Sequence, residues 1–342
     1  MTVTKEQIYS VLEKIQGLEV LVVGDLIVDR YVWGSVDRIS PEAPVPVVRV
    51  RKMEDRSGGA GNVVNNLVNL GCRVKITGFI GDDDEGRILA GIFDSQKVNR
   101  EGIIKVEKRP TSLKTRVIAQ RQQLLRIDRE ETDSPGVALS QGLAAVVESQ
   151  MTSAQAVIIS DYGKGTIGQA VLNKLSAAKK SGQSTLSKCP LVLDPHPANY
   201  SLYSGFNVAK PNKKEAEAAS GIVIKDKSSA EKAAEIIRTK WNTDLALITM
   251  GEDGVLISQN GQPPLHLKTR ALDVFDVSGA GDTVTAVYTA ALAAGADPKL
   301  AGHMGNLAAG VVVAEVGTVA ITVDAFRNHV ERIWKLEGGL KE

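Results

Sequence analysis

The sequence has few cysteines, almost no net charge and no metal-binding pattern of histidines. Only Cys72 and Cys189 occur among 342 residues, which excludes a disulfide framework and a cysteine-rich zinc site and favours a reducing compartment. The formal net charge of +1 gives no general attraction to nucleic acid or to an anionic membrane, so any role of positive charge must be local. None of the four histidines has the spacing of metal ligands.

Long apolar segments are also missing. The first residues, MTVTKEQIYSVLEKIQ, are polar and contain no signal-peptide core. The most apolar stretch, residues 307–323, contains Glu315 and two glycines and is too short and interrupted to span a bilayer. It is predicted to be a buried helix followed by a strand. We therefore expect a cytoplasmic protein.

The two commonest phosphate-binding signatures are absent as well. No G-x-x-x-x-G-K-[ST] occurs, and no G-x-G-x-x-G follows an apolar strand. This excludes a P-loop and a standard dinucleotide-binding fold, so a phosphate site must use another glycine-rich loop.

Short apolar runs alternate with helical patterns along most of the chain. The runs that predict buried strands lie at residues 18–25, 73–81, 155–161, 190–195, 205–212, 244–251 and 254–259. The helical patterns lie at residues 58–71, 85–96, 167–182 and 229–241. This alternation predicts an α/β fold with a doubly wound, mostly parallel sheet.

Two segments interrupt this alternation, at approximately 30–52 and 110–129. Both show the period of two that is typical of strands, the first contains three prolines, and QRQQ in the second resembles a hairpin turn. We predict a small antiparallel β lid, built from these two pieces of chain and attached to a single domain over residues 1–342. Such a sheet suits a lid over a site or a contact between subunits.

The segment DVSGAGDT, residues 276–283, is the best candidate for a phosphate site. Its glycines allow backbone N–H groups to approach an anion, at the start of a helix whose N-terminus favours negative charge. Asp282 could accept a proton from an attacking hydroxyl there, while the amides of Gly279, Ala280 and Gly281 stabilise the transferred group. The alternative is an ordinary helix start with Asp282 in its first turn.

A second group of polar residues follows the first strand. Asp25 and Asp29 lie in GDLIVDRY, and Gly59 and Asn62 lie at the helix start in SGGAGN. Ligands of open α/β sheets bind beyond the carboxyl ends of the strands, so these residues are suited to sugar hydroxyls. Each acid could equally be a solvated loop or cap residue.

Four cations are candidates for binding a substrate phosphate. Lys114 and Arg116 share one face of a strand, Arg126 follows on its partner strand, and Lys164 lies in DYGKG. Arg116 is the strongest candidate, because guanidinium groups bind phosphate through two parallel hydrogen bonds. The alternative is a solvated lid face, but four cations together favour a phosphorylated sugar.

Four segments in this order, SGGAGNVVNNLVNLG, GFIGDDDEG, KPNKKEAE and DVSGAGDT, resemble the ribokinase/PfkB carbohydrate kinases over nearly the whole chain. Within that family, GDLIVDRYVWGSVDRISPEAPVPVV, DYGKG and VLDPHP most resemble the bacterial D-glycero-β-D-manno-heptose 7-phosphate kinases of lipopolysaccharide-core synthesis. The resemblance implies a ribokinase-like fold, ATP and Mg²⁺ as cofactors, and direct in-line transfer of the γ-phosphoryl group to the C1 hydroxyl of the sugar phosphate.

The resemblance also implies roles for particular residues. Asp282 would be the general base and residues 279–282 the anion hole. Lys210, Asn212 and Glu215, in KPNKKE, would lie at the cofactor, with Asn212 and Glu215 organising Mg²⁺ through water. Without the family, the same segment is simply a capped helix start.

The nucleotide would lie against Thr249, Gly251, Gly254 and Asn306, which could otherwise be a strand-ending turn and a packed helix residue. Relatives also use a monovalent cation such as K⁺ near the anion hole.

Three further expectations concern the oligomeric state, an attached domain and the alternative functions. An exposed lid would suit a homodimer. Heptose kinases are often joined to a nucleotidyltransferase domain, and we expect here a kinase alone or an excised half. The rival functions are a related kinase for ribose, fructose phosphate or a nucleoside, and a non-catalytic sugar- or nucleotide-binding protein on the same scaffold.

Overall fold

A nine-stranded sheet forms the centre of the computed structural model, which describes residues 3–120, 122–185, 188–315 and 317–340. The strands follow the order β13-β12-β11-β10-β9-β8-β1-β4-β5, and neighbours are parallel from β5 to β11. Their bounds are β1 (Glu19–Gly24), β4 (Arg73–Gly81), β5 (Asn99–Val106), β8 (Ala156–Ser160), β9 (Leu191–Asp194), β10 (Val208–Ala209), β11 (Leu245–Thr249), β12 (Val255–Gln259) and β13 (Leu265–Leu267). The predicted mostly parallel sheet is confirmed.

One predicted parallel strand is antiparallel. The run at 254–259 is β12, which pairs antiparallel with β11 on one side and with β13 on the other. A short turn, Gly251–Asp253, joins β11 to β12. A parallel partner would need a crossover of a dozen or more residues, so this connection permits only a hairpin.

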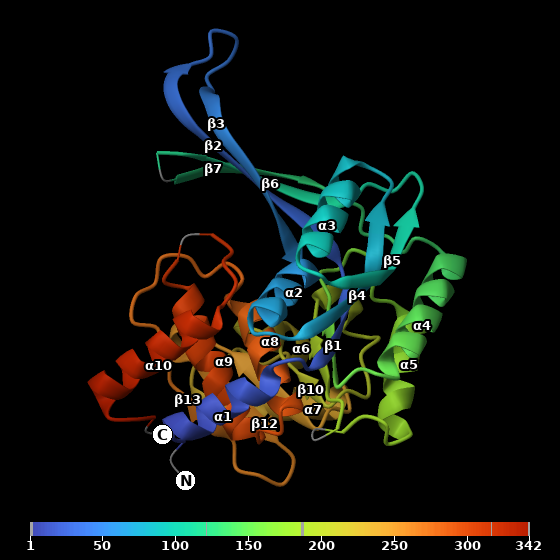
Figure 1. The fold of residues 1–342 in the computed structure, drawn as a ribbon, viewed down its shortest axis with the longest axis vertical. Coiled ribbons are helices and arrows are strands. Elements are labelled where there is room, and N and C mark those ends of the chain that lie inside the picture. Colours follow the sequence, from blue (N-terminus) through green and yellow to red (C-terminus); the bar gives the residue numbers. More distant parts are fainter. Residues whose placement is uncertain (1–2, 121, 186–187, 316, 341–342) are drawn as a thin grey trace.

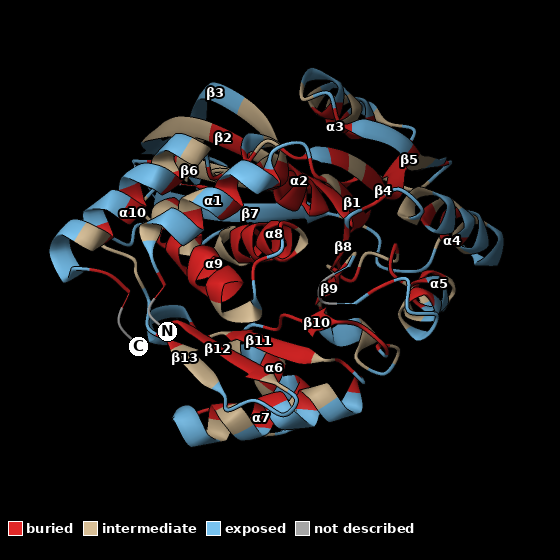
Figure 2. Cartoon of the chain, turned by 60° about the horizontal axis from the view of Figure 1, so that its bottom comes forward, coloured by how far each residue is buried: buried red, intermediate tan, exposed pale blue. Residues whose placement is uncertain are grey.

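Helices cover both faces of the sheet. One layer contains α1 (Lys5–Ile15), α2 (Ala60–Asn69), α3 (Asp84–Ser95), α8 (Ala280–Ala293), α9 (Pro298–Val312) and α10 (Val323–Glu337). The other contains α4 (Val137–Met151), α5 (Gln169–Lys180), α6 (Lys213–Ser220) and α7 (Lys227–Lys240). Alternate residues of β1 enter the two cores, Val20 and Val22 on the first side and Leu21 and Val23 on the second. Figure 2 shows that α8 and α9 are buried along most of their length.

The apolar stretch at 307–323 departs from its prediction. It begins inside α9 as predicted, but no strand occurs in the described residues of 313–322. Its backbone groups bond to a loop and to a helix side chain instead: the carbonyl of Val313 accepts from the amide of Phe275 at 2.7 Å, and the amide of Ile321 donates to the side chain of Asn66 on α2 at 3.0 Å. No described helix is long and apolar enough to cross a membrane.

A second sheet of four strands stands out from the body (Figure 1). Its order is β3-β2-β6-β7, with β2 (Leu26–Ile39), β3 (Pro46–Gly59), β6 (Ser112–Ala119) and β7 (Gln122–Arg129). The pairs β2–β3 and β6–β7 are antiparallel as predicted for the lid, and β6–β7 is the predicted hairpin, whereas the central pair β2–β6 is parallel. Residue 121, in the predicted QRQQ turn, lies outside the described residues. We call this sheet the lid, because β2 leaves the main sheet at the carboxyl end of β1.

Candidate active site

The start of α8 forms the floor of the site. Gly279 is its N-cap residue, with φ +80°, and no side chain caps the helix there. A Cβ atom at Gly279 would lie 2.8 Å from Asn62 Nδ2 and 2.9 Å from Thr318 Cγ2, so only glycine fits. The amide of Ala280 donates to the carbonyl of Val277 at 3.3 Å. Because this backbone hydrogen bond is long and no side chain caps the helix, the helix start can still accept an anion at residues 279–282.

The carboxylate of Asp282 is held from two sides. Asn62 Nδ2 lies 2.7 Å from its Oδ2, and the Tyr162 hydroxyl lies 2.6 Å from its Oδ1. Burial and the charge of Asp194 raise the pKa of Asp282 to about 6, although these hydrogen bonds and Lys210 act against the rise. A carboxylate with this pKa is mainly ionised at neutral pH, so it can accept a proton.

Asp194 and Lys210 form a buried ion pair beside this carboxylate. Lys210 Nζ lies 2.9 Å from Asp194 Oδ2, which also accepts a hydrogen bond from Thr285 Oγ1 at 2.8 Å. Burial lowers the pKa of Lys210, but the charges of Asp194 and Glu215 outweigh it and raise the value. Asp194 was not among the predicted site residues, although an acid at the end of an apolar strand is the same signal that pointed to Asp25.

Asn212 and Glu215 form a reciprocal cap at the start of α6. Asn212 Oδ1 accepts from the amide of Glu215 at 3.0 Å, and Glu215 Oε2 accepts from the amide of Asn212 at 2.7 Å. Burial and the charge of Asp194 raise the pKa of Glu215 to about 7. Lys210 thus faces the carboxylates of Asp194, Glu215 and Asp282, whose combined negative charge a divalent cation would help to neutralise.

No group of three or more potential metal-ligating side chains occurs among the described residues. Mg²⁺ commonly binds with one or two carboxylates, completing its shell with phosphate oxygens and water, so this donor set fits such an ion.

Asp25 and Asp29 lie in different environments. Asp25 is 1 % exposed, and its carboxylate accepts from the amides of Tyr162, Lys164 and Thr166 at 2.8, 3.0 and 3.1 Å. Asp25 therefore fastens the loop after β8, a role that the sequence did not suggest. Asp29 instead lies on lid strand β2 and accepts from Arg116 Nη1, on the neighbouring strand β6, at 2.6 Å.

Gly59 ends β3 and is the N-cap residue of α2, with φ +56°. A Cβ atom there would lie 2.6 Å from the carbonyl oxygen of Asp25. This close approach places Asn62, on the first turn of α2, opposite Asp282.

Three of the four predicted cations have carboxylate partners. Arg116 pairs with Asp29, Lys164 with Glu130 at 2.7 Å, and Arg126 with Asp128 at 2.9 Å. Lys114 is half-buried, with its Nζ 5.8 Å from the centre of the Tyr162 ring, and burial lowers its pKa.

A fifth cation, Arg56, was not predicted. It lies over the Tyr31 ring at 5.0 Å, and Arg116 lies over the same ring at 5.3 Å. Arg56 Nη1 also donates to the carbonyl of Thr318 at 2.8 Å, which connects the lid to the loop after α9.

The predicted nucleotide residues are only partly brought together. Thr249 ends β11 and pairs with Asn212, while Gly251 and Gly254 form the following turn with φ values of +62° and +82°. Asn306 is buried in α9, and its side chain donates to the carbonyl of Lys268 at 2.6 Å. Their contact with a nucleotide stays a prediction.

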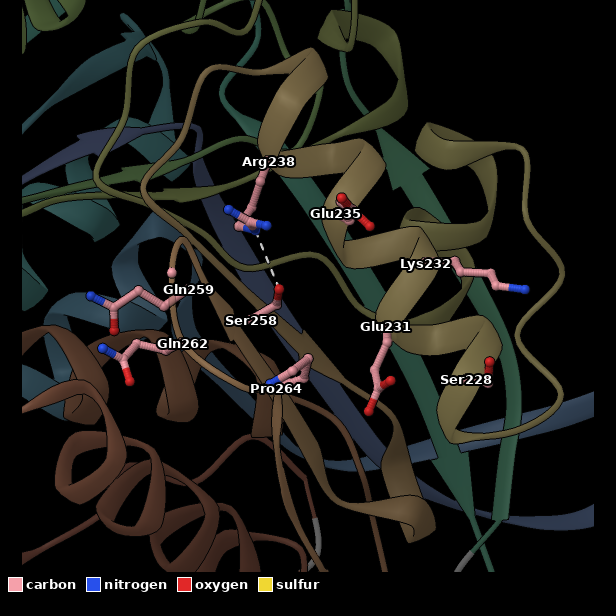
Figure 3. A pocket seen from close by; sticks show the side chains of 10 residues that line it. Ser228, Glu231, Lys232, Glu235, Arg238, Ser258, Gln259, Gln262 and Pro264 are labelled. Carbon is pink, nitrogen blue, oxygen red and sulfur yellow. Dashed lines mark hydrogen bonds between the residues drawn. The ribbon is translucent and has the colours of Figure 1, made fainter.

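A recess of about 380 Å³ lies elsewhere, between α7 and the β12–β13 hairpin (Figure 3). Its wall carries both charges, with Glu231 and Glu235 against Lys232 and Arg238, and Arg238 Nε donates to Ser258 Oγ at 3.2 Å. It shares no residue with the site around Asp282, which lies on the α8 side of the sheet.

Comparison with known proteins identifies the family. The model of the pfkB family carbohydrate kinases matches residues 18–325. Among curated relatives, the Bifunctional protein HldE of Desulfatibacillum aliphaticivorans is 44 % identical over 302 residues, covering 88 % of this chain and 61 % of the relative. The Bifunctional protein HldE of Caulobacter sp. (strain K31) is 43 % identical over 336 residues, covering 95 % and 67 %. The chain thus spans about two thirds of the length of these relatives.

Solved structures agree on the fold. Ribokinase of Arabidopsis thaliana, complexed with ribose and ATP, has a TM-score of 0.70 at 19 % identity, covering 94 % of this chain and 99 % of that chain. Phosphofructokinase-2 of Escherichia coli, in complex with substrates and products, has a TM-score of 0.71 at 19 % identity, covering 91 % and 97 %. The ribokinase-like fold is thereby confirmed, and the chain belongs to the pfkB family, a family of ATP-dependent carbohydrate kinases.

Proposed function

We propose that this protein transfers the γ-phosphoryl group of ATP to the C1 hydroxyl of D-glycero-β-D-manno-heptose 7-phosphate, a step in the synthesis of lipopolysaccharide-core heptose. The observation that carries the kinase assignment is the ionisable Asp282 carboxylate, held by Asn62 and Tyr162 at the uncapped start of α8. The narrower substrate is supported by the quoted sequence segments and by relatives named Bifunctional protein HldE.

The residues of the site divide the work of one in-line displacement. Asp282 accepts the proton of the sugar hydroxyl while that oxygen bonds to the γ-phosphorus, and the bond from phosphorus to the bridging oxygen of ADP breaks. The amides of residues 279–282 stabilise the negative charge on the transferred group. Asp29 and Asn62 orient the sugar.

The cofactor side of the site is formed by the residues after β9 and β10. Asn212 and Glu215 would hold Mg²⁺ through water, and the ion would neutralise charge on the phosphate oxygens of ATP. Lys210, fixed by Asp194 at 2.9 Å, supplies a buried positive charge for the same phosphates. A monovalent cation near the anion hole also stays a prediction.

The cations of the lid support a phosphorylated substrate. Lys114 has no carboxylate within ion-pair distance among the described residues, yet it is half-buried against Tyr162, which itself contacts Asp282. A partly desolvated ammonium group gains most from an anionic ligand. Arg116 lies two residues further along the same strand face and adds a planar guanidinium group.

The test is turnover of ATP with a panel of acceptors: D-glycero-D-manno-heptose 7-phosphate, sedoheptulose 7-phosphate, fructose 6-phosphate, ribose and adenosine. We expect strong preference for the aldoheptose phosphate. Activity on ribose or adenosine alone would preserve the kinase assignment and overturn the phosphate-binding role of the lid. Absence of turnover with all five would favour a binding protein.

We also propose that the protein is a homodimer formed through the outer face of the lid. Residues paired in register point to the same face of a sheet, and one such row consists of Met53, Val32, Val117 and Leu125 from the four strands. Met53 at one end of the row is 57 % exposed and Leu125 at the other end 46 %, whereas Val32 between them is only 8 % exposed. The two exposed apolar ends of the row suit a second copy of the same lid.

A further inference from the structure

Tyr162 lies in the loop after β8, and the reaction derived above does not require it. We infer that Tyr162 is a positioning residue for the general base, in that its hydroxyl holds one oxygen of the Asp282 carboxylate while Asn62 holds the other. The inference rests on the proposed function, since it assigns a task within the same site. In the sequence, DYGKG pointed to Lys164 and to the family resemblance but gave no role to Tyr162.

The two donors fix the orientation of the carboxylate. Tyr162 Oη lies 2.6 Å from Oδ1 and Asn62 Nδ2 lies 2.7 Å from Oδ2. They come from different elements, the loop after β8 and the first turn of α2, so rotation of the carboxylate would break at least one bond. Each carboxylate oxygen retains a second lone pair, which remains available to the sugar hydroxyl.

The loop that carries Tyr162 is itself held firmly. The Asp25 carboxylate accepts from the amides of Tyr162, Lys164 and Thr166, and Arg109 Nη2 donates to the carbonyl of Lys164 at 2.7 Å. These four hydrogen bonds hold the loop more firmly than an ordinary surface turn requires. They also explain why the buried residue Asp25 lies directly after β1. Asp25 therefore acts on the base indirectly, through the position of the tyrosine ring.

The charges around Asp282 give the tyrosine hydroxyl an electrostatic effect. From β9, Asp194 disfavours ionisation of Asp282, whereas Lys210, after β10, favours it. Burial and the charge of Asp282 raise the pKa of the Tyr162 phenol, so the phenol stays protonated and remains a donor. A donated hydrogen bond stabilises the ionised carboxylate, so Tyr162 keeps Asp282 in the form that accepts a proton.

The first test measures Asp282 directly, without turnover. Protein labelled with ¹³C at aspartate carboxyl carbons is titrated by NMR, with the Asp282 signal assigned from its loss in Asp282→Asn. In Tyr162→Phe, which keeps the ring, we expect the pKa of Asp282 to rise by about one unit, the scale of one hydrogen bond to a charged group. An unchanged value would overturn the inference.

A matched control uses the same chemical change far from the site. The Tyr9 hydroxyl donates to Glu331 Oε1 at 2.6 Å, on helices α1 and α10. Tyr9→Phe therefore also removes a phenol that donates to a carboxylate at the same distance. We expect it to leave the titration of Asp282 unchanged, and a shift equal to that of Tyr162→Phe would show a general effect and overturn the inference.

The second test is the pH dependence of kcat with the preferred acceptor. In Tyr162→Phe, the acidic limb should move up by about one pH unit, with the KM for ATP unchanged. At pH 7, kcat should fall about twofold, because the ionised fraction of Asp282 falls from about nine-tenths to about one-half. An Asp282 pKa that rises while the acidic limb stays in place would overturn the positioning role. If the wild-type protein phosphorylates no acceptor, the proposed function fails, and the NMR titration alone decides whether Tyr162 sets the ionisation of Asp282.

Discussion

Asp282 is the residue on which the proposed reaction depends most directly. Asp282→Asn keeps the size of the side chain but removes the group that accepts the proton, so turnover should fall by about three orders of magnitude or more. Binding of ATP, measured by calorimetry, should persist, because the phosphate-binding amides are unchanged. Asp226→Asn, at the exposed N-cap of α7, is the matched control and should keep full turnover. Near-normal turnover of Asp282→Asn would remove Asp282 as the base.

The same residue should make stability depend on pH. Its pKa is raised to about 6 in the folded state, so the folded state binds this proton more tightly than the unfolded state does. The associated stabilisation is complete at low pH and is lost as the pH rises through 6. The free energy of unfolding of Asp282→Asn, relative to wild type, should therefore increase by at most about 3 kcal/mol between pH 4 and pH 7.5.

Urea unfolding at the two pH values measures this difference. Asp226→Asn again serves as the comparison. Hydrogen bonds from Ser229 lower the pKa of Asp226, so the free energy of unfolding of this variant, relative to wild type, should change with pH in the opposite direction. A constant difference between Asp282→Asn and wild type would contradict the raised pKa of Asp282.

The sequence predicted part of the environment of Asp282. Asp282 and Asn62 were both selected from glycine-rich helix starts, and the structure brings them within 2.7 Å across 220 residues of chain. Tyr162, Asp194 and Arg56 were missed, because their contacts with Asp282, Lys210 and Thr318, respectively, arise only when distant segments pack together. Local patterns show which residue type begins a helix but not which side chain faces it.

At the scale of elements, the two ends of α8 offer a direct comparison. Gly279 and Gly295 both have positive φ, +80° and +88°, but only at Gly279 would a Cβ atom meet neighbours, Asn62 and Thr318. Gly295→Ala should lower the free energy of unfolding by about 1 kcal/mol through backbone strain, and Gly279→Ala should lower it by more, because its Cβ atom also meets Asn62 and Thr318. Only Gly279→Ala should also lower kcat, by about tenfold or more, because it displaces Asn62.

Chemical unfolding and steady-state kinetics of both variants test this expectation. Equal kcat values for the two variants would show that the start of α8 tolerates a shift and would weaken the anion-hole assignment.

The elements themselves were largely predictable, and the exceptions have physical causes. Buried parallel strands such as β1 and β8 have continuous apolar sequences, which identify them without tertiary information. β5 begins with Asn99, Arg100 and Glu101 and therefore lacked that signal. The direction of β12 depends on the length of one turn. The apolar segment after α9 forms hydrogen bonds with a loop and with a side chain of α2 rather than within a sheet.

At the scale of the whole molecule, the lid has two chemically different faces. Tyr31 and Arg116 are paired in register and lie on the face toward the site, where Arg116 meets Asp29. Lys114 lies on this face too, and Lys114→Met should raise the KM for the heptose phosphate about tenfold while leaving the KM for ATP unchanged. Lys52→Met, at an exposed lid lysine paired with Glu54, is the control and should change neither value. An equal loss with a non-phosphorylated acceptor would contradict phosphate binding by Lys114.

The outer face of the lid should determine the oligomeric state. Met53 and Leu125 occupy the two edge strands of the lid, β3 and β7, at either end of one apolar row. Met53→Glu combined with Leu125→Glu places four like charges in the proposed interface, two from each copy, and should weaken dimerisation about 100-fold or more. Sedimentation equilibrium across a range of protein concentrations measures the change.

The control is Val223→Glu, which replaces a 63 % exposed valine between α6 and α7 and should leave the dimer intact. A wild-type protein that sediments as a monomer, or a charged double variant that still dimerises, would reject the lid as the interface.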